Sequence, residues 1–182
     1  CRNYKPTLVE DLIQELEHNE ILVKVIAEEK CCGMPKLDLV DLESVEKLME
    51  FNVPKLIEEI NSGFDIISLV PSCVLMFKQE LPLLFDGNED LQNIKKYMYD
   101  PFEYLAKRDS DGKLKKDFKS SLGKIAYQVA CHQRVQNIGP RTKELLEMIP
   151  STEVNTIERC SGHDGTYAVK KETYENSIKI AK

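Results

Sequence analysis

Two adjacent cysteines, Cys31 and Cys32, followed by Gly33, are the residues of this sequence that point most clearly to chemistry. Neighbouring side chains of an extended segment diverge, so two adjacent thiolates would not easily bind one small metal ion. In zinc sites, two or more residues usually lie between the two cysteines of a pair. A multi-iron cluster can accept both thiolates, and Gly33 lets the backbone come close to it. The alternative is a pair of free cysteines in the core, where free cysteine is common.

The remaining cysteines predict partners for this pair. Cys31, Cys73, Cys131 and Cys160 each come just after a predicted strand, and Cys1 would do so if a strand preceded it. The carboxyl ends of strands are where α/β sheets bind ligands. We therefore expect the loops around Cys1, Cys31 and Cys73 to meet at one edge of one sheet. The predicted metal ligands are Cys1, Cys31, Cys32, Cys73, Cys131 and Cys160.

The elements that would position these cysteines alternate along the chain. Runs of β-branched and apolar residues predict strands at 21–26, 64–70, 124–130 and 154–159. Residue patterns predict helices at 8–16, 38–60, 71–82, 143–149 and 167–182, and one or two polar helices at 88–107. This alternation predicts an α/β fold with mostly parallel sheets flanked by helices.

The cysteines also repeat along the chain. Cys1 and Cys31 flank a predicted helix and strand, and Cys131 and Cys160 do so at nearly the same separation. Cys160-Ser161-Gly162 stands where the first unit has Cys31-Cys32-Gly33. We expect two related units with a pseudo-twofold arrangement, 1–106 and 124–182, joined by a charged, turn-rich linker at 107–123.

Composition excludes several classes of protein. The net charge of −6 over 182 residues argues against nucleic acid as a partner. No apolar stretch is long enough to span a membrane, and nothing resembles a signal peptide. Six cysteines are too few for a disulfide scaffold in a chain of this length, which favours a reducing, cytoplasmic setting. Both ends are expected to continue into a longer protein.

Two histidines and a second glycine accompany the later cysteines. His132 and His163 can be read as ligands, as hydrogen-bond donors to a cluster, or as polar residues that line the cleft. Gly162, like Gly33, can offer backbone N–H groups to a cofactor. The stretch 162–166 at a predicted helix start can also bind an anion, although a short glycine pair is weak support for that reading.

The sequence resembles the cysteine-rich CCG domain family, and the likeness spans the whole chain. That family includes domains of the B subunit of heterodisulfide reductase and of the C subunit of anaerobic glycerol-3-phosphate dehydrogenase, and the likeness is stronger to the latter. The residues that carry it are Asn3-Tyr4, Cys31-Cys32-Gly33-Met34-Pro35, Ser72-Cys73 with Lys78-Gln79-Glu80, Tyr127 through Cys131-His132, Glu144-Leu145-Leu146, and Gly162 through Tyr167 with Lys170-Lys171-Glu172.

The resemblance implies an iron–sulfur cluster, [4Fe-4S] and in some members non-cubane. Cys1, Cys31, Cys32 and Cys73 match the first family unit, but Val70 replaces the first cysteine of its closing Cys-x-x-Cys pair. In the second unit Ser161 replaces the middle cysteine, and the closing pair would lie beyond Lys182. Four thiolates remain the usual number for one cluster.

The function that the resemblance implies is electron transfer. The chain would relay electrons from a flavin-containing dehydrogenase subunit toward a membrane quinone, beside an upstream ferredoxin-like segment, without oxidising a substrate itself. It would be cytoplasmic and would reach the inner face of the membrane only through its partners. The alternatives are an enzyme that cleaves a disulfide at a cluster, and a zinc-binding or metal-free interaction domain.

Overall fold

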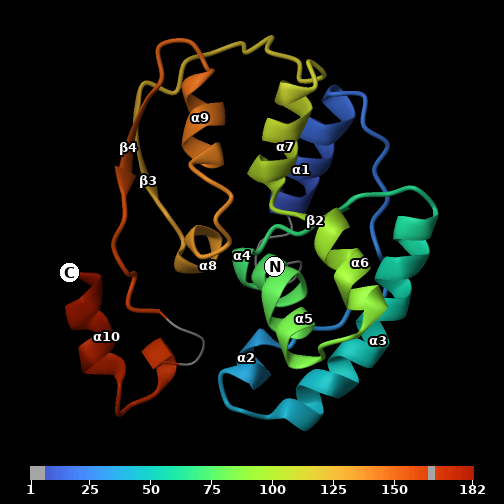
Figure 1. The fold of residues 1–182 in the computed structure, drawn as a ribbon. Helices are drawn as coiled ribbons and strands as arrows, with labels where there is room; N and C mark the ends of the chain where they lie inside the picture. Colours follow the sequence, from blue (N-terminus) through green and yellow to red (C-terminus); the bar gives the residue numbers. More distant parts are fainter. Residues whose placement is uncertain (1–6, 164–166) are drawn as a thin grey trace.

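A computed structural model describes residues 7–163 and 167–182, so Cys1, Asn3-Tyr4 and residues 164–166 lie outside the described part. Helices dominate, and the strands are short (Figure 1). The elements are α1 (Thr7–His18), α2 (Met34–Leu37), α3 (Leu42–Asn61), β1 (Ile66–Ile67), α4 (Pro71–Leu75), the π-helical η1 (Met76–Glu80), α5 (Leu81–Leu84), α6 (Glu89–Tyr97), β2 (Met98–Tyr99), α7 (Pro101–Ser110), β3 (Lys124–Gln128), α8 (Cys131–Arg134), α9 (Arg141–Glu147), β4 (Glu153–Ile157), the 3-10 helix η2 (Tyr167–Val169) and α10 (Tyr174–Ala181).

The strands form two separate two-stranded sheets, and both are parallel. Strand β1 pairs with β2 with Ile66 opposite Met98, and β3 pairs with β4 with Lys124 opposite Glu153. The predicted strands at 124–130 and 154–159 are thus confirmed with slightly shifted ends. The fold is mixed α/β, as predicted, but it is mostly helical, and the larger sheets expected from the sequence do not form.

The predicted strand at 21–26 is wrong. These residues have no regular secondary structure, and they run beside α3 instead of beside another strand. Side chains attach the segment to that helix: Lys24 Nζ donates to Glu59 Oε1 at 2.6 Å, and Ile26 packs against the core. The apolar side chain of Leu22 is 79% exposed. A β-branched run forms a strand only where a backbone edge is available to pair with it, and a helix offers none.

Helix α3 organises the N-terminal core. Its N-cap Asp41 accepts a hydrogen bond from Ser44 N–H, and the helix continues through Pro54 to Asn61 without a break. The buried face repeats at helical spacing and carries Val45, Met49, Val53, Leu56 and Ile60. It packs against α2 and α6, and its apolar residues belong to the core cluster that also contains Cys32.

The segment after β1 forms one helical rod from Pro71 to Leu84, longer than predicted. A π-helical stretch, Met76–Glu80, precedes Pro82 in this rod. Proline lacks the N–H that an α-helix needs and its ring crowds the preceding turn, so a local change of helical pitch lets the rod continue. Val74, Met76 and Leu81 are fully buried along it.

The C-terminal half contacts this rod through α8. Strands β3 and β4 are joined through α8 and α9, and α8 lies beside α4 (Figure 1). Helix α9 contacts both α7 and β4, and α10 follows at the chain's end. None of the helices in the described ranges is long and apolar enough to cross a lipid bilayer.

The stretch predicted as a linker is attached to the N-terminal helix. Helix α7 includes residues 107–110, and the chain then passes the end of α1. Asn19 is only 2% exposed and its Oδ1 accepts a 2.7 Å hydrogen bond from the Lys115 N–H. Exposed contacts of Lys115 with Glu20 and of His18 with Asp117 lie beside it. The division into units at 107–123 stays a prediction.

Candidate metal centre

The loop that carries the adjacent cysteines is held by one buried amide. Asn52, on the buried face of α3, accepts a 3.0 Å hydrogen bond from Lys30 N–H through Oδ1. Its Nδ2 donates to the carbonyl oxygens of Lys30 and Cys31 at 3.3 and 3.2 Å. These three bonds fix the backbone that leads into Cys31 and Cys32, so the loop has a defined conformation without a strand.

Gly33 turns the chain from this loop into α2. Its φ of 96° lies in the left-handed region, where glycine carries no Cβ penalty. A Cβ at this position would meet Met76 Cε at 3.5 Å, an ordinary contact, so the backbone angle is what requires glycine. The turn directs Cys32 into the core, where it is 7% exposed, and leaves Cys31 exposed.

Cys73 reaches the same place from the first turn of α4. Its N–H donates to the Val70 carbonyl at 2.9 Å, and its half-buried side chain packs against the core cluster that contains Cys32. The three thiols are hydrogen-bonded in series, Cys31 to Cys32 and Cys32 to Cys73. The structure therefore brings together Cys31, Cys32 and Cys73, although Cys31 follows an irregular segment and not a strand.

The hydrogen bonds shift the pKa values of the Cys32 and Cys73 thiols in opposite directions. Donation from the Cys32 thiol, with further donation from the Ser68 hydroxyl, lowers the pKa of Cys73 below its ordinary value of 9.0. The same bond to Cys73, together with burial, raises the pKa of Cys32 far above 9.0. Cys73 is therefore the first thiolate of the metal-free site, and Cys32 keeps its proton.

Backbone N–H groups face the sulfur atoms in both halves of the chain. Met34 N–H bonds to the sulfur of Cys32, and Gly162 N–H donates to Cys160 Sγ at 3.3 Å. In each case the donor lies two residues after the cysteine. Such bonds stabilise a thiolate and tune the potential of a metal that it binds.

The later cysteines are not gathered in the same way. Cys131 begins α8 and Cys160 follows β4, and both are exposed. Gly162, with φ 72°, has a packing role: its carbonyl accepts a 2.6 Å bond from Ser177 Oγ of α10, and a Cβ would lie 2.2 Å from the Ser177 carbonyl oxygen.

The two candidate histidines occupy different surroundings. His132 Nδ1 lies 2.7 Å from Ser72 Oγ, so it contacts the residue next to Cys73. His163 is exposed, and its side chain makes no hydrogen bond within the described ranges. Neither position tests the predicted roles at a metal.

Three residues that the sequence did not single out support the site: Asn52, Ser68 and Gln136. Asn52 could have been recognised as the one amide within the apolar stripe of α3. Ser68 and Gln136 carry no such pattern: Ser68 interacts with Cys73 of the following helix, and the partner of Gln136, the Pro71 carbonyl, is 65 residues away in the sequence.

The described thiols come from two segments of the chain: Cys31 and Cys32 precede α2, and Cys73 lies in the first turn of α4. In residues 7–163 and 167–182 no three histidine, cysteine or carboxylate side chains converge as ligands of one metal ion. Thiolates are the ligands of iron–sulfur clusters, so the chemistry of this donor set is compatible with such a cluster. Cys1, the fourth cysteine of the family pattern, lies outside the described residues.

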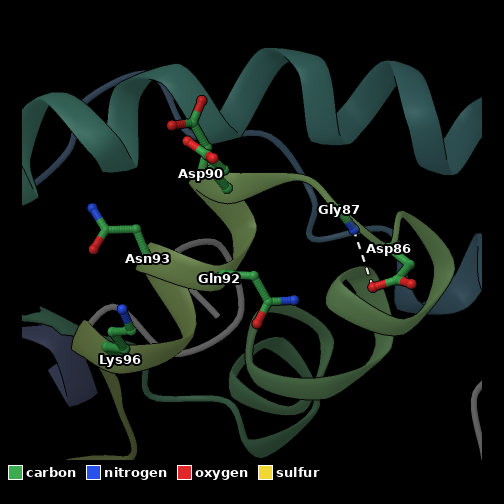
Figure 2. Close-up of a pocket in the computed structure, with 7 residues that line it drawn as sticks. Asp86, Gly87, Asp90, Gln92, Asn93 and Lys96 are labelled. Atoms are coloured by element: carbon green, nitrogen blue, oxygen red, sulfur yellow. Dashed lines mark hydrogen bonds between the residues drawn. The ribbon is translucent and has the colours of Figure 1, made fainter.

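Two surface depressions are lined by residues other than the cysteines. The larger, of about 690 Å³, is polar and lined by residues of the α5–α6 turn and of α6, among them Asp86, Asp90 and Lys96 (Figure 2). A smaller one, of about 370 Å³, separates α7 from the loop before α9 and includes Lys107 and Arg141. No cysteine lines either of them.

Comparison with known proteins agrees with the cysteine arrangement. The chain is 29% identical over 181 residues to the C subunit of anaerobic glycerol-3-phosphate dehydrogenase from Escherichia coli K12, and equally to that from Escherichia coli O157:H7. The aligned region covers 98% of this chain but 45% of each relative, so the chain spans about half of their length. No solved structure matches the chain. Residues 1–78 match the CCG cysteine-rich domain, the family that the cysteine motifs resemble.

Proposed function

We propose that the chain is an iron–sulfur electron-transfer module of a multisubunit dehydrogenase, of the kind to which the related C subunit belongs. The observation that carries this proposal is the series of thiols Cys31, Cys32 and Cys73, of which Cys32 and Cys73 pack on the core of the matched domain. A thiolate-bound cluster would supply single-electron exchange with little rearrangement. Cys31, Cys32 and Cys73 would hold it together with Cys1.

The chain's own residues would prepare this site. Asn52 orients the first loop, and the apolar residues Met34, Val45 and Met76 keep water from the inner face. The Ser68 hydroxyl and the Met34 N–H donate to cysteine sulfur, which would raise the potential of a bound cluster by favouring its more reduced charge state. Val70 stands at the N-cap of α4, so a fifth thiolate and a non-cubane cluster would require a donor from elsewhere.

The second unit would be a degenerate copy of the first. Gly33 and Gly162 both have positive φ after a cysteine-bearing loop, which supports the predicted pseudo-twofold repeat. Cys131 and Cys160, with Gly162 and His163, would then be the counterparts of the first site's residues, with Ser161 in place of the middle cysteine.

The partners follow from the role of a relay. Electrons would come from a flavin-containing subunit, pass through an upstream ferredoxin-like segment, and leave toward a membrane quinone. The chain would be cytoplasmic and would lie at the inner face of the membrane through these partners. Its net charge of −6 disfavours direct binding to anionic lipid.

The test is metal analysis of the full-length protein purified without oxygen, with EPR of the reduced form. We expect iron and acid-labile sulfide, and their loss from the first site in Cys32→Ser and Cys73→Ser. Cys131→Ser is the matched control and should retain the signal of that site. Absence of iron after reconstitution would overturn the proposal, and zinc in its place would favour the interaction domain. Turnover of a disulfide substrate by the reconstituted protein would favour the disulfide-cleaving enzyme.

A further inference from the structure

The second half of the chain contacts the first site through α8, at the residues just before Cys73. His132 Nδ1 lies 2.7 Å from Ser72 Oγ, and Gln136 Nε2 donates to the Pro71 carbonyl at 3.0 Å. His132 lies in α8 and Gln136 lies just after it. Their partners, Ser72 and Pro71, are consecutive residues at the start of α4. Helices α4 and α8 pack together at this point (Figure 1).

The geometry fixes the orientation of the Gln136 amide. Its Nε2 also donates to the His132 carbonyl at 2.7 Å, so it lies between two carbonyl oxygens, and a flipped amide would place oxygen against oxygen. The opposite atom, Oε1, is buried and has no hydrogen-bond partner within the described residues.

We propose that His132 and Gln136 are positioning residues for Cys73, and that the second half of the chain thereby supports the first site. They hold Pro71 and Ser72, which sets the start of α4 and with it the distance between Cys73 and Cys32. Asn52 performs the equivalent task for the Cys31–Cys32 loop from within the first half. The inference rests on the proposed function for its purpose, but the geometry is a property of the metal-free chain.

Dibromobimane, which fluoresces after joining two nearby thiols, provides a test in the reduced, metal-free full-length protein. The measured quantity is the initial rate of cross-linking between the peptide with Cys31 and Cys32 and the peptide with Cys73, identified by mass spectrometry. We expect His132→Ala to lower this rate by about fivefold, the equivalent of one hydrogen bond. His132→Asn, which can still bond to the Ser72 hydroxyl, should restore most of it.

Gln136→Glu makes the test more specific, because glutamate has nearly the same side-chain shape as glutamine but lacks the Nε2 donor. A carboxylate would face the carbonyl oxygens of Pro71 and His132, so the rate should fall at least as far as in His132→Ala. Gln92→Glu, an exposed position on α6, is the control for the added charge. Arg134→Ala is the control for α8, because its exposed side chain lies 3.9 Å from Glu158 and makes no hydrogen bond to residues 71–73.

A double-mutant cycle separates positioning from general destabilisation. If His132 acts through Ser72, then Ser72→Ala should change the rate about as much as His132→Ala, and the two together should add little. Unaltered rates in folded His132→Ala and Gln136→Glu proteins, or fully additive effects, would overturn the inference. If the reconstituted wild-type protein binds no iron, only the proposed function is overturned, because the cross-linking reaction needs no cluster.

Discussion

Cys32 and Cys73 have the same side chain, yet their surroundings assign them opposite tendencies to ionise. The thiolate of Cys73 receives donors from Cys32 and Ser68, whereas Cys32 is buried and gives its proton to that bond. A thiolate is the form that binds iron and reacts with alkylating agents. Of the two thiols, Cys73 is therefore the one that ionises first as the pH rises.

The pH dependence of alkylation tests this division in the metal-free protein. Cys73 should react with iodoacetamide with a midpoint below pH 9.0, and Cys32 should stay unreactive through that range, as measured by mass spectrometry of the peptides. Ser68→Ala removes one donor and should move the Cys73 midpoint upward. Equal midpoints for both thiols would contradict the hydrogen-bonded series.

Folding stability should follow the same shifts. The pKa of Cys73 is depressed on folding, so its contribution is present above pH 9.0 and is lost as pH falls through the folded value. The pKa of Cys32 is raised, so its contribution is present below pH 9.0 and is lost as pH rises. The free energy of unfolding should therefore fall above pH 9.0, and less so in Cys32→Ser, when both are measured by urea titration.

Asn52 offers a second test at the level of one residue. Asn52→Asp keeps the acceptor for Lys30 N–H but puts carboxylate oxygen against the carbonyls of Lys30 and Cys31. Loss of two donors and burial of a charge should lower the free energy of unfolding by about 2–4 kcal/mol. The same change at Asn155, exposed on β4, should stay within about 0.5 kcal/mol. Urea unfolding of both variants makes the comparison, and equal effects would contradict the role of Asn52.

At the scale of elements, the docking of α10 depends on the missing side chain of Gly162. The Ser177 hydroxyl reaches the Gly162 carbonyl, and the helix backbone comes so close that no Cβ fits. Gly87 has a similar positive φ of 83° but open space around it. A comparison of alanine substitutions at Gly162 and Gly87 therefore separates the free-energy cost of a left-handed backbone from that of a steric clash.

Gly162→Ala should release α10, while Gly87→Ala should cost only the backbone strain. We expect a loss of about 1 kcal/mol in unfolding free energy for Gly87→Ala and about 2–4 kcal/mol for Gly162→Ala, where overpacking adds to it. Amide hydrogen exchange of residues 174–181 should accelerate only in Gly162→Ala. Protection of that helix in both variants would show that the close approach is not needed.

At the scale of the whole molecule, distant segments are joined by a few buried polar side chains. At the end of α1, Asn19 Nδ2 donates to the Glu15 carbonyl. Its Oδ1 accepts from the Lys115 N–H, almost a hundred residues away in the sequence. His132 and Gln136 join the second half to α4 in the same manner. Apolar packing forms the N-terminal core, and these polar side chains decide how the remaining parts attach to it.

Asn19→Ala should free the stretch at 113–119 from α1. Loss of its hydrogen bonds would leave the Lys115 N–H without its partner, so trypsin should cleave after Lys113, Lys115 and Lys116 several times faster, with a modest loss of global stability. Asn155→Ala on exposed β4 is the control. Cleavage at an unchanged rate would show that the stretch is held by other contacts.

The sequence by itself predicted the likeness of residues 1–78 to the CCG domain, helices that include α3 and α9, and the strands β3 and β4. Local spacing carries that information, because helix period and thiol spacing are properties of nearby residues. Only the tertiary structure decided that residues 21–26 lie unpaired along α3, that Asn52 holds the loop that follows them, and that His132 contacts Ser72. Each of these depends on which distant group supplies a hydrogen-bond partner, and no local pattern specifies that partner.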